Sequence, residues 1–307
     1  MRIVRYAHAA GARMGLVVDD IVIDLHDFVV DAGIEVPAEV VTAIMSAPIG
    51  DALARMTSAQ RDRYRVKDAE LLAPIDRPGK ILALAANYSA HANEVGETPR
   101  DKSNSVPHVF PKMPSTLAGP QDPILIPEVS DMVDYEVELG VVIGGVVDRV
   151  SPSEALSHVA GYVLFNDVSA RRMTFRERSK VPDEDGFWDF LYGKWCNGFA
   201  IVGPWIASVQ QIPDPTDLRM NLSVNGMTRQ SARVGEYTFT IAEAISFMSR
   251  ICRLEPGDVI AMGTPAGIGE MGLGCLNPGD VVEASIDGLG VQRNLVERAP
   301  SATGGAR

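Results

Sequence analysis

Asp134-Tyr-Glu136-Val-Glu138-Leu-Gly-Val-Val-Ile143 is a strand-like stretch of mainly aliphatic residues that carries two glutamates two positions apart. Successive side chains of a strand alternate between its faces, so Glu136 and Glu138 point the same way, and Asp134 can join them. Carboxylates on one face of an apolar strand repel each other and resist burial unless a cation or hydrogen-bond donors compensate. A divalent metal held by oxygen ligands would compensate, whereas a solvated edge strand would need none.

Strand-like segments outnumber helical ones and do not alternate regularly with them, which predicts an α+β fold. Asn225-Gly226 between two such segments is a typical hairpin turn. Helices are expected over 37–46 and 58–64, and after the capping boxes that begin at Ser151 and Thr240. The expected strands of the main part cover 80–85, 124–126, 135–143, 161–166, 198–202, 218–224, 258–262 and 281–286.

A proline- and glycine-containing stretch, Leu71-Leu-Ala-Pro-Ile-Asp-Arg-Pro-Gly79, is typical of a linker. It predicts a small N-terminal α+β domain over 1–74 and a main domain over 75–298. The last residues, 299–307, are small and polar and are expected to be disordered.

The composition restricts the possible partners. The chain has 28 basic and 40 acidic residues and a net charge of −12, with no basic cluster, which argues against binding to nucleic acid or an anionic membrane. No apolar run reaches the ~18 residues of a membrane span, and the beginning does not have the pattern of a signal peptide. Three scattered cysteines do not form a disulfide framework. We therefore expect a cytoplasmic, enzyme-like protein.

The segment Asn87-Tyr-Ser-Ala-His91-Ala-Asn-Glu94 is expected to begin a short helix after a strand. His91 and Glu94, at i and i+3, would share one face of it. A carboxylate beside an imidazole fixes its tautomer and raises its basicity, which suits a general base acting on water. The alternative is a weak pair on a surface helix.

Two further charged residues are candidates for chemistry. Asp167, in Phe165-Asn-Asp167-Val-Ser-Ala-Arg171, ends an apolar strand, where it is either functional or the N-cap of a helix. Lys194 lies between apolar and aromatic neighbours and could stabilise a developing negative charge, or extend along the surface to water. Cys196 is expected to be a packing residue.

Gly267-Ile-Gly269-Glu-Met-Gly272 matches a dinucleotide fingerprint, but a turn into another strand follows it instead of a helix. We interpret it as a glycine-rich loop in which Thr264 and nearby backbone N–H groups could face an anionic ligand.

In this order, these motifs resemble the fumarylacetoacetate hydrolase family over residues 78–290. The residues that carry the resemblance are Pro78-Gly-Lys-Ile81, Asn87-Tyr88 with His91 and Glu94, Lys112-Met-Pro-Ser-Thr-Leu-Ala-Gly119, Asp134-Tyr-Glu136-Val-Glu138, Asn166-Asp167-Val-Ser-Ala-Arg171, Lys194, and Gly263-Thr264-Pro-Ala-Gly267-Ile-Gly269.

The resemblance implies a β-rich mixed roll or sandwich, a homodimer, and Mg²⁺ or Mn²⁺ bound by Glu136, Glu138 and Asp167, with Ca²⁺ as a substitute in crystals. It implies a small-molecule substrate among 2-oxo and diketo acids. His91, Glu94 and Lys194 are the expected catalytic residues. The residues expected to bind substrate are Thr264, Arg171 and Tyr88.

The expected reaction is metal-dependent hydrolysis of a C–C bond in an acylpyruvate-like or diketo acid. The alternatives are decarboxylation or isomerisation through the same metal-bound enolate, and a catalytically inert metal-binding scaffold. Ala85, Arg172 and Asn197 depart from the family pattern, so the substrate class stays open. The charged, aromatic segment 174–191 is expected to form a lid.

Overall fold

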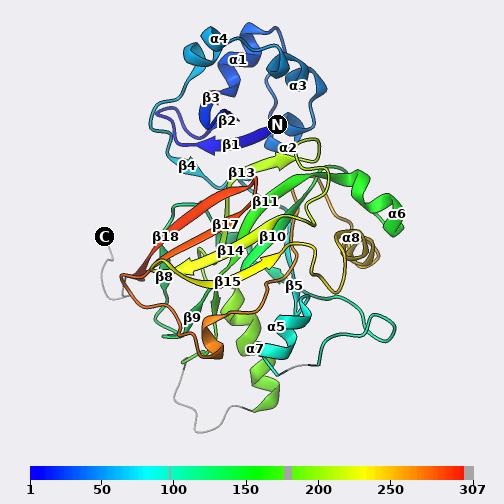
Figure 1. Cartoon of the computed structure of the whole chain (residues 1–307), viewed down its shortest axis with the longest axis vertical. Helices are drawn as coiled ribbons and strands as arrows, with labels where there is room; N and C mark the ends of the chain where they lie inside the picture. Colours follow the sequence, from blue (N-terminus) through cyan, green and yellow to red (C-terminus); the bar gives the residue numbers. More distant parts are fainter. Residues whose placement is uncertain (97, 176–181, 301–307) are drawn as a thin grey trace.

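The computed structural model describes residues 1–96, 98–175 and 182–300, and strands dominate it (Figure 1). The largest sheet runs in the order β3-β2-β1-β13-β11-β10-β16-β5-β6, with β4 paired to β1 and β7 to β13. Its strands, in chain order, are β1 (Arg2–Tyr6), β2 (Arg13–Val18), β3 (Ile21–Asp24), β4 (Leu71–Leu72), β5 (Ile81–Ala85), β6 (His108–Lys112), β7 (Leu117–Ala118), β10 (Val137–Ile143), β11 (Val159–Asp167), β13 (Ala200–Ser208) and β16 (Val259–Ala261).

A second sheet has the order β15-β14-β17-β18-β8, and β12 pairs with β9 in a two-stranded ribbon. These strands are β8 (Ile124–Ile126), β9 (Val133–Asp134), β12 (Ser169–Ala170), β14 (Arg219–Val224), β15 (Met227–Arg233), β17 (Val281–Ile286) and β18 (Gly290–Arg298). The helices are α1 (Leu25–Asp31), α2 (Val40–Ile44), α3 (Ala47–Ala54), α4 (Ser58–Tyr64), α5 (Ser89–Glu94), α6 (Pro152–Ala155), α7 (Asp183–Lys194) and α8 (Ile241–Ser249).

The central strand β10 is buried along its whole length because both of its faces are covered. Leu139 and Val141 belong to one hydrophobic cluster, whereas Val142 belongs to another. Glu138 lies on the Val142 side of the strand, since it is four residues away. The expected alternation of side chains is therefore present, and it directs Glu138 away from the cluster that contains Leu139.

Most expected strands are present, with shifted ends. The turn Asn225-Gly226 joins β14 to β15 with positive φ at both residues, as a tight hairpin requires. The strand expected over 135–143 begins two residues later, at Val137, and Tyr135 and Glu136 lie between β9 and β10. The helix expected over 37–46 is shorter, and α1 and α3 were not anticipated.

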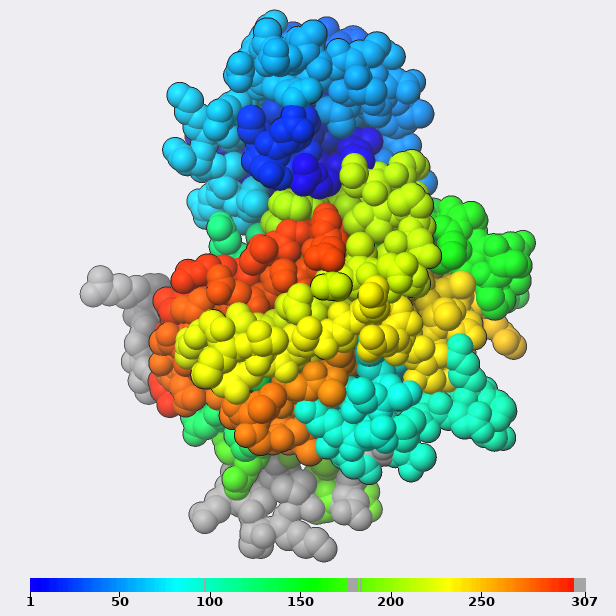
Figure 2. Space-filling view, viewed as in Figure 1, coloured from blue at the N-terminus to red at the C-terminus, as the bar shows by residue number. Residues whose placement is uncertain are grey.

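The N-terminal segment continues the large sheet. Ile3 of β1 pairs with Ile206 of β13, and Ile3 shares a hydrophobic cluster with Ile81 and Val142. In Figure 2 this segment (blue) covers one end of the molecule. The boundary at residue 74 thus divides the chain but not the sheet, and an independent N-terminal domain stays a prediction. Of the expected tail, Ala299 donates a backbone hydrogen bond to Ile126, and 301–307 lie outside the described residues.

Candidate metal centre and active site

Three buried carboxylates meet where β10 and β11 come together. Glu138 lies in β10, Glu136 lies just before this strand, and Asp167 is the last residue of β11. The backbone N–H of Asp167 donates to the carbonyl oxygen of Glu136 at 2.8 Å. One carboxylate oxygen from each of the three lies within 4.8 Å of the other two. The antiparallel register of β10 and β11 thus brings together three acids that are separated in sequence.

Two buried lysines neutralise part of this charge. The ammonium nitrogen of Lys194, the last residue of α7, lies 2.8 Å from Glu136 Oε2 and 2.7 Å from Asp167 Oδ2. Lys112, at the end of β6, contacts the other oxygen of Asp167 and donates to the carbonyl of Val168 at 3.2 Å. Asp167 therefore lies between the amino groups of two lysines, although burial lowers the pKa of Lys112.

The pKa values of the two glutamates move in opposite directions. Burial alone would raise the pKa of Glu136, but the charges of Lys194 and Arg171 hold it below its ordinary value. The pKa of Glu138 is raised well above its ordinary value, first by burial and then by the negative charges of Asp167 and Glu136. Glu138 therefore keeps its proton to a higher pH than an ordinary glutamate does.

The donor set fits a hard divalent cation. Glu136, Glu138 and Asp167 offer oxygen ligands from a buried site, as Mg²⁺ and Mn²⁺ prefer. The raised pKa of Glu138 marks the side of the cluster where positive charge is deficient, since the lysines contact only Glu136 and Asp167. A cation bound there would replace the proton of Glu138.

The dyad anticipated on α5 is present. His91 Nδ1 lies 3.4 Å from Glu94 Oε2, a long contact, and both side chains are mostly buried. The backbone N–H of Gly267 donates to both oxygens of Glu94, at 2.9 and 3.0 Å, which fixes that carboxylate. The imidazole of His91 lies near enough to the carboxylate cluster that its protonated form would help to lower the pKa of Glu136, after the larger effects of Lys194 and Arg171.

The glycine-rich loop binds the protein's own carboxylates. Besides Gly267, Gly263 donates its N–H to Glu138 at 2.7 Å, and Gly269 donates to Asp134 at 2.7 Å. These groups are therefore not free for an anionic ligand, which corrects the sequence interpretation of the loop at those positions.

The Thr264 hydroxyl is also engaged inside the protein. It donates to the carbonyl of Val137 at 3.0 Å and accepts from Gln230 at 2.8 Å. Tyr88 is buried, donates to the carbonyl of Val234 at 3.0 Å, and packs edge-to-face against Tyr237. Both side chains thus have hydrogen-bond partners inside the protein, and their expected roles in substrate binding stay predictions.

Arg171 does face the site. Its guanidinium contacts Glu136, and its Nε lies 3.0 Å from Asp134 Oδ2. Asp134 itself was expected to be a possible third acid of the same strand face. It lies instead outside the cluster of three, and Arg171 contacts both Asp134 and Glu136.

The expected lid is only partly described. Residues 176–181 lie outside the described residues, and α7 forms most of the remainder. Phe187 and Trp188 on this helix are largely exposed, and Trp188 stacks on Tyr192. Since α7 ends at Lys194, an aromatic helix is directly connected to the carboxylate cluster. Asn197 is exposed.

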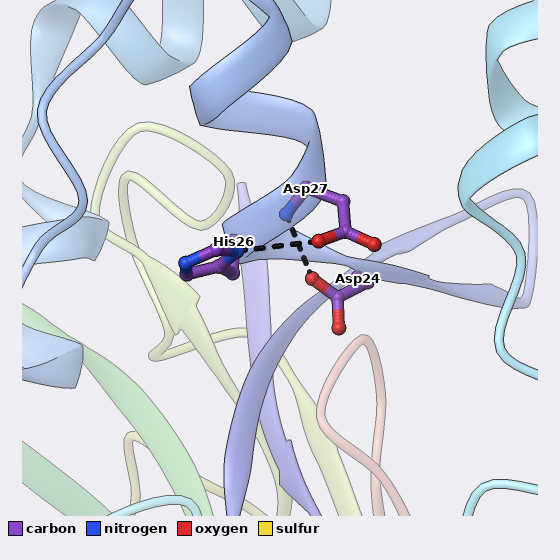
Figure 3. Close-up of side chains that lie close together, drawn as sticks. All are labelled: Asp24, His26 and Asp27. Carbon is purple, nitrogen blue, oxygen red and sulfur yellow. Dashed lines mark hydrogen bonds and ion pairs between the residues drawn. The ribbon is translucent and has the colours of Figure 1, made fainter.

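A second acidic cluster, Asp24, His26 and Asp27, lies at the start of α1 (Figure 3). Asp24 caps this helix by accepting from the backbone N–H of Asp27 at 2.9 Å, and its other oxygen contacts Tyr6 and Arg13. These contacts account for the cluster as a helix cap. The adjacent cavity of about 520 Å³ is lined by Arg5 and Arg13, both already paired with aspartates.

Lys112 was not assigned a role from the sequence. Its only signal is a lysine at the end of an apolar strand, a pattern that many surface strands share. It is completely buried against Asp167, although three strands separate β6 from β11 in the order of the large sheet.

Fold and site together define a β-rich α+β protein with a buried acidic centre beside a histidine–glutamate pair. The chain belongs to the fumarylacetoacetate hydrolase family, since residues 80–297 match the family model described as "Fumarylacetoacetate (FAA) hydrolase C-terminal". It is thus an enzyme of a family whose members include hydrolases and isomerases of keto acids.

A 2,4-didehydro-3-deoxy-L-rhamnonate hydrolase of Sphingomonas sp. is 37% identical over 279 residues, covering 90% of each chain. A maleylpyruvate hydrolase from Sphingobium sp. SYK-6, solved with manganese(II) and pyruvate, is 28% identical with a TM-score of 0.74, covering 98% of this chain and 100% of that one. A probable 2-hydroxyhepta-2,4-diene-1,7-dioate isomerase from Mycobacterium abscessus is 29% identical with a TM-score of 0.75 at the same coverage. Among the described residues, no helix has the length and apolar character needed to cross a membrane.

Proposed function

We propose that this protein is a divalent-metal-dependent hydrolase that cleaves a C–C bond of an acylpyruvate-like or diketo acid. The observation that carries the proposal is the position of the His91–Glu94 pair beside the buried cluster of Glu136, Glu138 and Asp167. A general base next to a cation site is the arrangement needed to activate water against a chelated dicarbonyl compound.

Glu136, Glu138 and Asp167 would hold Mg²⁺ or Mn²⁺. When bound, the cation would polarise the 2-oxo and carboxylate oxygens of the substrate. Arg171 would pair with the substrate carboxylate, because its guanidinium lies at the edge of the cluster. The relative solved with manganese(II) and pyruvate supports this metal and substrate class.

His91 would take a proton from water, and the resulting hydroxide would attack the distal carbonyl carbon. The C–C bond then breaks, its electron pair passes to the pyruvate fragment as an enolate, and protonation of that enolate completes the products, a carboxylic acid and pyruvate. Glu94 would orient the imidazole, since Gly267 fixes its carboxylate. Lys194, whose pKa is raised because Asp167 and Glu136 outweigh the effect of burial, would stay charged and stabilise the enolate.

Isomerisation or decarboxylation is the second candidate, because a similar solved structure is that of a probable isomerase. Both reactions form the same enolate but need no activated water. A catalytically inert scaffold is the third hypothesis, and the presence of the His91–Glu94 pair argues against it.

We also propose that the protein is a cytoplasmic homodimer.

The test is a panel of acylpyruvates, diketo-deoxy-sugar acids, oxaloacetate and hydroxymuconate-type dienes, assayed with Mg²⁺, with Mn²⁺ and with chelator. Cleavage of an acylpyruvate or diketo acid that chelator abolishes supports hydrolysis. Release of CO₂, or formation of an isomer without C–C bond cleavage, supports the second candidate. The absence of turnover with every compound would support a catalytically inert scaffold. His91→Ala is the variant that should lose activity, and His26→Ala is its matched control, since His26 belongs to the helix-cap cluster.

A further inference from the structure

Asp134 is a fully buried carboxylate that accepts four hydrogen bonds, two at each oxygen. Oδ1 accepts from the backbone N–H groups of Tyr135 at 2.8 Å and Gly269 at 2.7 Å. Oδ2 accepts from the backbone N–H of Glu270 at 3.1 Å and from Arg171 Nε at 3.0 Å. One aspartate therefore joins the glycine-rich loop to the guanidinium that contacts Glu136.

The arginine and the loop that Asp134 joins both contact residues of the proposed active site. Arg171 contacts Glu136, and Gly267, two residues before Gly269, holds Glu94 of the dyad. The close approach requires glycine at 269, because a Cβ there would lie 2.8 Å from Asp134 Oδ1. Among the described residues, Glu270 also lies near Arg171 Nε, at 3.4 Å, but it is partly exposed and a weaker partner.

We propose that Asp134 is a positioning residue for the recognition of the substrate carboxylate. It directs the guanidinium of Arg171 into the site and fixes the loop from Gly267 to Glu270, so that the arginine and the dyad keep a constant separation. This inference rests on the proposed function, because it needs Arg171 to meet a 2-oxo acid.

Asp134→Asn is the test variant, and Asp258→Asn is its matched control. Asp258 is equally buried, accepts from the backbone N–H groups of Lys80 and Glu255 at 2.8 Å, and pairs with the Lys80 ammonium. Asp258 also lies close to the strand that carries Glu138, because the next residue, Val259 of β16, pairs with Val142 of β10. Loss of a buried, charge-paired aspartate as such should therefore affect both variants alike.

The first readout is the affinity for pyruvate in the presence of saturating Mn²⁺, measured by calorimetry. Asp134→Asn should weaken pyruvate binding by about tenfold or more, the effect of one charge-assisted hydrogen bond, with Mn²⁺ affinity changed by less than about threefold. Asp258→Asn should leave both affinities unchanged. Equal pyruvate affinities in the two variants would overturn the positioning role.

The second readout needs no ligand. Hydrogen exchange at the Glu270 amide should accelerate in Asp134→Asn but not in Asp258→Asn, and unchanged exchange would overturn the proposal. If Asp134→Asn does not fold, the Arg171 Nε–H of the wild-type protein is measured instead, and its signal is assigned by its loss in Arg171→Lys. This proton should exchange slowly with water, and rapid exchange would overturn the positioning role. A wild-type protein that binds neither Mn²⁺ nor pyruvate would instead overturn the proposed function, while the exchange data would still decide the anchoring by Asp134.

Discussion

The backbone nitrogen of Gly267 lies 2.9 Å from Glu94 Oε1, so a loop that follows β16 holds the carboxylate of a dyad on α5. The two residues are 173 positions apart. The orientation of the proposed general base therefore depends on a glycine that contacts neither His91 nor the carboxylate cluster in the described structure.

Gly267→Ala should lower turnover by about tenfold or more while the metal affinity persists. A Cβ at this position would lie 2.0 Å from the carbonyl oxygen of Arg229, and φ is +108°, so the loop must move away from Glu94. Gly272→Ala is the control, since φ is +103° there but nothing lies within 4 Å of the added Cβ. Equal turnover in the two variants would show that backbone strain alone is responsible.

His91→Ala should reduce hydrolysis by roughly two to four orders of magnitude, the usual contribution of a positioned general base. Glu94→Gln should lose less, because the imidazole remains but is less well oriented. Mn²⁺ affinity should survive in both variants, since neither residue belongs to the proposed ligand set. Near-wild-type cleavage of an acylpyruvate by His91→Ala would exclude water activation by this residue, whereas retained CO₂ release from oxaloacetate alone would favour decarboxylation.

Glu138→Gln and Asp167→Asn should both abolish metal binding but shift the stability of the cation-free protein in opposite directions. Glu138→Gln replaces a carboxyl group whose ionised form burial and the negative charges of Asp167 and Glu136 disfavour, so the melting temperature should stay equal or rise. Asp167→Asn leaves Lys112 and Lys194 without this buried partner and should cost about 3–5 kcal/mol in free energy of unfolding. Thermal melts in chelator compare the two, and equal destabilisation would contradict the assigned charge balance.

Mn²⁺ affinity should rise with pH, by up to about tenfold per unit, because the cation must displace the proton of Glu138. The folded-state pKa of Glu138 is raised above its ordinary 4.5. Its contribution to the stability of the cation-free protein is therefore fully present below 4.5 and is lost as the pH rises through the folded-state value. Calorimetry in two buffers of different ionisation enthalpy should report about one proton released per Mn²⁺. Release of no proton would mean that Glu138 is already ionised.

The sequence by itself determined the local features. Strand alternation gave Glu136 and Glu138 a common direction, helical spacing paired His91 with Glu94, and the turn Asn225-Gly226 fixed a hairpin. These predictions succeed because they concern residues a few positions apart, where backbone geometry alone sets the side-chain directions.

The tertiary structure alone decided which distant groups meet. Lys112 of β6 contacts Asp167 of β11, although three strands separate them in the sheet order, and Asp134 pairs with Arg171 instead of joining the acidic cluster. The N–H groups of the glycine-rich loop, which the sequence left available for a ligand, are taken by Glu138, Glu94 and Asp134. The local sequence pattern cannot predict these pairings. A buried charge needs a partner within hydrogen-bond distance, and the tertiary fold determines which distant residues come that close.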